Sequence, residues 1–133
     1  MLEAIRILLS VAAMLDYEIW QMDVKTAFLN GNLDQRIYIQ HTEGFTQDGQ
    51  ETKFCELQKS IYGLKQASRS WNIRFDETVK IYGFTQLEDE PCVYKLSHEG
   101  KIMFLLLYVD DILLIGKDFH DPNLLIATNF YTF

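Results

Sequence analysis

The sequence has few of the residues that build metal-stapled, disulfide-linked or fibrous proteins. Its 133 residues include two cysteines, two prolines and seven glycines. Cys55 and Cys92 are far apart and form no CxxC pair, which argues against a zinc site or a disulfide framework. We expect both to be reduced core cysteines of an intracellular protein. No internal repeat, low-complexity tract or proline- and glycine-rich linker divides the chain, so the sequence predicts one domain over residues 1–133.

Basic residues are also scarce. Lysine and arginine total 12 against 19 aspartates and glutamates, which gives a net charge of -7. This acidic balance argues mildly against a stand-alone nucleic-acid binder, because such domains are usually basic. It is compatible with an enzyme whose surplus carboxylates hold metal ions.

Long uninterrupted apolar runs are missing as well. The opening stretch MLEAIRILLSVAA is too short to span a bilayer, and Glu3 and Arg6 lie within it. We therefore expect neither a membrane span nor a secretory signal, and a location in the cytoplasm or the nucleus.

The periodicity of the apolar residues predicts an α+β fold. Helices are expected at residues 2–15 and 66–82, and strands at 17–24, 36–40, 92–97, 101–109 and 112–117. Residues 25–31 predict a short turn or helix, and the polar residues 41–53 predict a loop. In the first helix the apolar stripe comprises Leu2, Ile5, Leu8, Leu9, Ala12 and Leu15. Trp20, Met22 and Met103 are expected in the core. Strands do not alternate regularly with helices, which favours α+β over a doubly wound sheet.

Two adjacent aspartates, Asp110 and Asp111, interrupt the apolar run FLLLYVDDILLIG. A buried carboxylate costs several kcal/mol unless it is paired. As the two-residue loop of a tight hairpin, Asp-Asp is a poor sequence, because such turns favour Asn-Gly or Asp-Gly. Two interpretations remain open on these residues alone, a solvated hairpin tip and a functional carboxylate pair.

A third aspartate, Asp23, lies at the end of another predicted strand. Three neighbouring carboxylates would repel one another, and hard divalent cations relieve such repulsion. Asp23 can equally serve as the N-cap of the segment that follows it. Spacing in the sequence does not show whether Asp23 and Asp110 are close in space.

Three motifs occur in the order MDVKTAFLNG, KSIYGLKQASRSW and LLLYVDDILLIGK, with DEPCVYK between the last two. Together they closely resemble the reverse transcriptase of copia-type LTR retrotransposons. The resemblance covers about residues 2–117, and residues 118–133 depart from the pattern. It implies a right-hand polymerase palm, with a ferredoxin-like antiparallel sheet packed on helices, and part of the fingers. The family's thumb and RNase H patterns are not found in this sequence.

The resemblance also implies a function and a site. The expected function is RNA-directed DNA polymerase activity within a Pol polyprotein, from a truncated chain that is weakly active or inactive alone. Asp23, Asp110 and Asp111 would be the catalytic carboxylates, and with the carbonyl of Val24 they would hold two Mg²⁺ or Mn²⁺ ions. The expected partners are an RNA or DNA template-primer and deoxynucleoside triphosphates, with no membrane; the oligomeric state is not predicted.

Further residues take roles by the same resemblance. The nucleotide pocket would be lined by Lys25, Thr26, Ala27, Phe28 and Gln66, with Phe28 as a steric gate against a ribose 2′-hydroxyl. Tyr108, Lys65 and Arg69 would contact primer or template.

Each of these assignments has a structural alternative. Phe28 and Tyr108 are also ordinary core aromatics, Gln66 is also a helix-start residue, and Lys65 and Arg69 also suit a solvated helix face. For the whole chain, the alternative is a non-catalytic remnant that binds nucleic acid or protein on a palm-like fold. A different two-metal nucleotidyl enzyme, such as a cyclase, is a third hypothesis, and GLKQASRSW argues against it.

Overall fold

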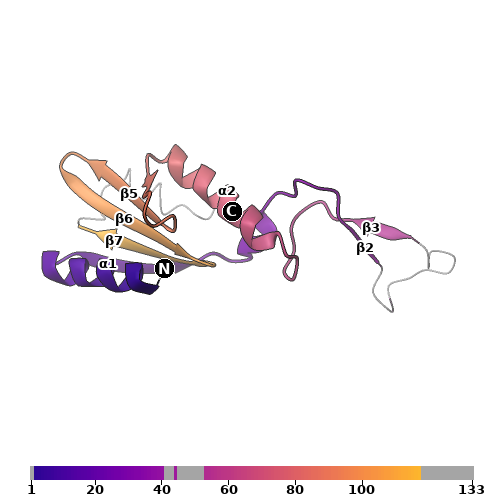
Figure 1. Cartoon of the computed structure of the whole chain (residues 1–133), viewed down its shortest axis with the longest axis horizontal. Coiled ribbons are helices and arrows are strands. Elements are labelled where there is room, and N and C mark those ends of the chain that lie inside the picture. The colour runs from indigo at the N-terminus through magenta and orange to yellow at the C-terminus, as the bar shows by residue number, and fades with distance from the viewer. Residues whose placement is uncertain (1, 41–43, 45–52, 118–133) are drawn as a thin grey trace. The chain divides into compact units, whose positions relative to one another are not determined.

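The computed structural model describes residues 2–40, 44 and 53–117 (Figure 1). Its elements, in chain order, are α1 (Leu2–Leu15), β1 (Glu18–Asp23), η1 (Ala27–Asn30), β2 (Tyr38–Gln40), β3 (Phe54–Glu56), α2 (Ala67–Ile81), β4 (Thr85–Gln86), β5 (Val93–His98), β6 (Lys101–Tyr108) and β7 (Asp111–Gly116). Most of the loop expected at residues 41–53, and all of the divergent tail expected at 118–133, lie outside the described residues.

The chain forms two compact units. Of the described residues, 2–27 and 75–117 belong to the first unit, and 28–40, 44 and 53–74 belong to the second. Helix α2 begins in the second unit and ends in the first. In the described part of the chain, no helix is long and apolar enough to cross a membrane.

The first unit is built on a five-stranded sheet with the order β1-β7-β6-β5-β4. Every neighbouring pair in it is antiparallel. The expected α+β class is thus confirmed: the described residues combine antiparallel sheets with the helices α1 and α2. The strands expected at 92–97 and 101–109 pair as a hairpin, which turns at Glu99 and Gly100, whose φ angles are 49° and 76°.

Side chains alternate between the two faces of this sheet, and each face has its own core. Ala4, Leu8 and Ala12 of α1 pack with Val93, Leu106 and Ile115 on one face, and Figure 1 shows α1 running along this side of β7. Tyr94 and Leu105, one position along their strands, point to the opposite face. There the end of α2 covers them, and the rings of Phe75 and Tyr94 meet edge-on with centroids 5.7 Å apart.

The predicted helix at residues 2–15 is confirmed, but fewer residues of its predicted apolar stripe are buried than expected. The buried residues are Ala4, Leu8 and Ala12. Two of these three are alanines, whose small side chains let the helix lie close to the sheet. Three members of the predicted stripe are exposed, namely Leu2, Leu9 and Leu15.

A polar network fastens the end of α2 to β5. The hydroxyl of Tyr94 donates to Oδ1 of Asp76 over 3.1 Å. Oδ2 of the same carboxylate accepts from Nζ of Lys80, one helical turn later, at 2.7 Å. Tyr94 is fully buried, and its hydroxyl is satisfied by a charged acceptor that is itself partly exposed. Gly83 then ends the helical segment at φ 87°, with its N–H bonded to the carbonyl of Lys80.

The second unit contains η1 from Phe28 onward, the two-stranded antiparallel sheet β2-β3 and the first turns of α2. The expected exposed strand near residues 36–40 is confirmed, and all three residues of β2 are exposed. Strand β3, its partner, was not predicted from the sequence, and neither was β4 of the first unit.

Two core assignments from the sequence are wrong. Trp20 is 49% exposed, because β1 is the edge strand of its sheet, and its indole N–H donates to the carboxylate of Glu18. Cys55 is exposed on β3, whereas Cys92 is half-buried, and neither forms a disulfide. Met103 is buried as predicted.

Candidate active site

The pairing of β1 with β7 brings the sequence-predicted aspartates to one end of the first unit's sheet. Asp23 and Asp111 are direct partners in the antiparallel register. Cβ atoms of such partners lie about 4.5–5.5 Å apart on the same face. The next residue continues the pairing, since the N–H of Val24 donates to the carbonyl of Asp110 over 3.2 Å. The three aspartates that sequence spacing could not place together are therefore neighbours on the backbone.

The turn that carries the aspartates differs by one position from the sequence-based interpretation. Tyr108 and Asp111 are paired at the ends of β6 and β7, so the two loop residues are Val109 and Asp110. Asp111 is the first residue of β7. Val109 has φ 61°, a region that β-branched residues rarely adopt. The turn therefore holds about 1–3 kcal/mol of backbone strain next to the aspartates.

These aspartates are not deeply buried, so the desolvation cost of placing carboxylates within an apolar run is reduced. Asp110 and Asp111 are half-buried, and Asp23 is exposed. The side-chain amide of Gln21 donates to Oδ1 of Asp111 over 3.4 Å. Because Gln21 lies two positions before Asp23 on β1, both side chains stand on the face that carries Asp111.

The donor set at this sheet end suits a hard divalent cation, since Mg²⁺ takes carboxylate oxygens. The carboxylates do not converge, however: among the residues that the structure describes, no group of three His, Cys, Asp or Glu side chains could hold a metal ion. The residue types and the backbone placement fit such an ion. The side chains would have to turn toward a common point to bind it.

The predicted nucleotide residues that follow β1 differ in exposure. Lys25 and Thr26 are exposed, and Thr26 has φ 56°, with Oγ1 donating to the carbonyl of Lys25 over 2.7 Å. Ala27 is fully buried at the start of η1. In this structure its side chain is therefore not accessible to a ligand.

The other predicted site residues belong to the second unit, apart from Tyr108, which is 38% exposed at the end of β6. Phe28 is half-buried, and its ring meets the ring of Tyr62 at a tilt of 56° with centroids 4.8 Å apart. Lys65 and Arg69 are exposed, and Gln66 is half-buried just before α2.

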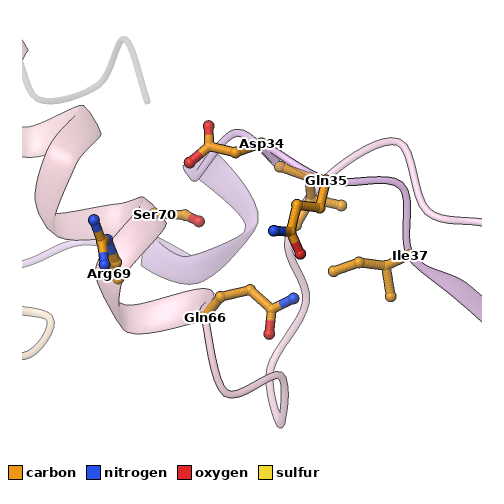
Figure 2. Close-up of a pocket in the computed structure, with 7 residues that line it drawn as sticks. Asp34, Gln35, Ile37, Gln66, Arg69 and Ser70 are labelled. Atoms are coloured by element: carbon orange, nitrogen blue, oxygen red, sulfur yellow. The ribbon is translucent and has the colours of Figure 1, made fainter.

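A pocket of about 430 Å³ lies within the second unit. Its lining residues are Leu33, Asp34, Gln35, Ile37, Gln66, Arg69 and Ser70. Figure 2 shows Gln66 and Arg69 coming from the start of α2, opposite Gln35 and Ile37 from the segment before β2. Gln66 and Arg69 are candidates from the sequence, whereas Asp34 and Gln35 are not, because no motif marks their segment.

Comparison with known proteins identifies the family of this chain. The family described as reverse transcriptase (RNA-dependent DNA polymerase) matches residues 1–127. This chain belongs to the reverse transcriptase family. The match includes all three aspartates and the segments that form the pocket, and it runs past Lys117, where the motif resemblance ends.

The relatives of this reverse transcriptase domain are transposon polyproteins. It is 49% identical over 116 residues to the "Retrovirus-related Pol polyprotein from transposon TNT 1-94" of Nicotiana tabacum, a match covering 86% of this chain and 9% of that protein. It is 37% identical over 122 residues to the corresponding polyprotein from transposon RE1 of Arabidopsis thaliana, covering 92% and 8%. The "Transposon Ty1-OR Gag-Pol polyprotein" of Saccharomyces cerevisiae is 32% identical over 124 residues, covering 90% and 6%.

The copia-type resemblance is thereby confirmed. The chain spans less than a tenth of the length of each of these three polyproteins. No solved structure matches the chain.

Proposed function

We propose that this chain is the palm, with part of the fingers, of a copia-type reverse transcriptase, and that it catalyses RNA-directed DNA synthesis by two-metal nucleotidyl transfer. The observation that carries the proposal is the register of β1 with β7, which sets Asp23 opposite Asp111 and bonds Val24 to Asp110. Membership of the reverse transcriptase family supports it.

Asp23, Asp110 and Asp111, with the carbonyl of Val24, would hold two Mg²⁺ or Mn²⁺ ions. Such ions, when bound, lower the pKa of an attacking hydroxyl and stabilise the pyrophosphate that leaves. The chain's own contribution is to present the carboxylates from two hydrogen-bonded strands. The ladder sets the backbone positions of Asp23 and Asp111, and the hairpin turn sets that of Asp110, while partial exposure leaves the carboxylates room to rotate.

The remaining residues act on substrates in this proposal. The Phe28 ring, supported by Tyr62, excludes a ribose 2′-hydroxyl. Lys25, Thr26 and Gln66 contact the nucleotide, and Tyr108 stands at the primer end. Lys65 and Arg69, both exposed, would contact template phosphates. The substrates are then a template-primer and deoxynucleoside triphosphates.

Primer extension tests the proposal. The purified chain, given an RNA template, a DNA primer, deoxynucleoside triphosphates and Mg²⁺ or Mn²⁺, is expected to lengthen the primer, though weakly. Asp110→Asn should lower that rate about a hundredfold or more, because loss of metal charge stabilisation costs several kcal/mol. Asp89→Asn removes an equal charge from an exposed position outside the sheet and should leave extension unchanged. Extension that persists in Asp110→Asn contradicts the proposal.

The second candidate function is non-catalytic binding of nucleic acid. It is favoured by the polar pocket of the second unit, which is lined without any of the three aspartates. It predicts single-strand binding that is unchanged in Asp23→Asn/Asp110→Asn and lost in Arg69→Ala, with no primer extension by the unaltered chain.

A further inference from the structure

Gly31 lies at the meeting point of three segments of the second unit. Its N–H donates to the carbonyl of Phe28 over 3.3 Å, which closes η1. Its carbonyl accepts from the N–H of Ser60, also over 3.3 Å. Gly31 is itself buried, and Ser60 is fully buried beneath it. One glycine therefore ties the end of η1 to the segment that leads to Tyr62.

The third segment, the first turns of α2, touches Gly31 directly. A Cβ atom at Gly31 would lie 2.8 Å from Cβ of Ser70, 2.9 Å from the backbone N of Trp71 and 3.0 Å from the carbonyl carbon of Ser70. Two of these atoms are helix backbone, and the Trp71 side chain is 1% exposed, so the helix cannot yield locally.

The backbone conformation at Gly31 does not explain why this position is a glycine. Four other glycines of the described chain have positive φ, and Gly31 is not among them. Close approach to α2 is thus the reason that this position has no side chain.

The two elements that meet at Gly31 contain or directly follow proposed nucleotide residues. Phe28 belongs to η1, three positions before Gly31 and against the ring of Tyr62. Gln66 accepts, through its carbonyl, the N–H of Ser70 over 2.9 Å, so it is held to the turn of α2 that Gly31 touches. Any displacement between η1 and α2 would change the separation of Phe28 from Gln66.

We propose that Gly31 is a positioning residue for sugar discrimination: its missing side chain lets η1 lie against α2 and so sets the Phe28 ring relative to Gln66. This inference rests on the proposed function. A misplacement of about 1 Å can change a rate about a hundredfold, which makes a single methyl group at Gly31 a sensitive probe.

The test compares dATP with ATP, which differ only in the 2′-hydroxyl. The ratio of their kcat/KM values is measured in primer extension, and the ratio of their dissociation constants is measured by equilibrium binding to the same chain. Gly31→Ala is expected to weaken the preference for dATP about tenfold or more, so that the dATP:ATP ratio of kcat/KM falls and the dATP:ATP ratio of the dissociation constants rises. Asn32→Ala, at the exposed neighbouring position, should leave both ratios unchanged. Phe28→Ala gives the two ratios expected when the steric gate is removed.

A companion variant separates positioning from folding. Gly31→Ala/Ser70→Gly removes the Cβ atom that the new methyl would meet at 2.8 Å and should recover part of the lost discrimination. If Gly31→Ala does not fold, ratios in the double variant that lie between those of the unaltered chain and Phe28→Ala support the inference.

Two results would overturn the inference in distinguishable ways. A folded Gly31→Ala chain that is less stable or slower, but keeps both dATP:ATP ratios, shows a purely structural glycine. An unaltered chain that binds dATP and ATP equally, or neither, overturns the proposed function and this inference with it.

Discussion

Removal of one buried hydroxyl tests how the first unit is held together. Tyr94→Phe deletes the O–H that donates to Asp76 over 3.1 Å and leaves the fully buried ring in place. A hydrogen bond to a charged group contributes about 1.5–3 kcal/mol. Asp76 keeps the ammonium of Lys80 at 2.7 Å and is partly solvated, so its carboxylate is not left unpaired. We therefore expect the lower end, a loss of about 1.5 kcal/mol in the free energy of unfolding.

Urea denaturation followed by far-UV circular dichroism measures this loss. The midpoint should fall while the denaturant slope stays constant, because the surface exposed on unfolding is nearly unchanged. Tyr38→Phe, which removes a hydroxyl from a 55% exposed tyrosine, should change the stability by less than about 0.5 kcal/mol. Equal effects of the two substitutions would refute the reasoning, and so would additive effects of Tyr94→Phe and Asp76→Ala in a double-mutant cycle.

Two further predictions concern stability. Burial, and then the neighbouring Asp76 carboxylate, raise the pKa of Tyr94; the folded state thus keeps a proton that the unfolded state loses above about pH 10. The contribution of Tyr94 to the free energy of unfolding should be fully present below that pH and should fall above it by up to about 1.4 kcal/mol per pH unit. Urea denaturation at a series of pH values from 9 to 11 checks this. An equally steep fall of stability with pH in Tyr94→Phe would contradict the prediction. Glu99→Asn should raise the free energy of unfolding by about 0.5–1 kcal/mol, because φ 49° and 76° at Glu99 and Gly100 suit an Asn-Gly turn. Ser97→Asn is the control, and no gain over it in thermal melts would count against the turn assignment.

Local sequence predicts much of this fold because its elements carry strong periodic or turn signals. Helix α1 has the predicted bounds, and the Glu99-Gly100 hairpin follows from a short polar break between apolar strands. Strand β3 was missed because it has three residues, all exposed, and therefore lacks an apolar pattern. Trp20 was misassigned because its exposure depends on the place of β1 at the edge of the sheet, which no local pattern specifies.

The candidate site was less predictable than the fold, because it depends on long-range register. The sequence identified Asp23, Asp110 and Asp111 as candidates, but only the ladder between β1 and β7 makes Asp23 and Asp111 partners. The pairing of β6 with β7 places the turn at Val109 and Asp110, whereas the sequence alone suggested a loop of Asp110 and Asp111. Asp34 and Gln35 enter the pocket through the packing of the second unit, and their own sequence carries no sign of it.

The edge position of β1 has a consequence for how the aspartates stay together. Asp23 is carried by the outermost strand, whereas Asp111 lies on β7, which is hydrogen-bonded on both sides. Edge strands can detach in local openings whose free energy is far below that of global unfolding. Amide hydrogen exchange should therefore be faster along β1 than along β6. How long Asp23 and Asp111 stay side by side then depends on how often β1 detaches from β7. A cation that bound both carboxylates would slow that detachment.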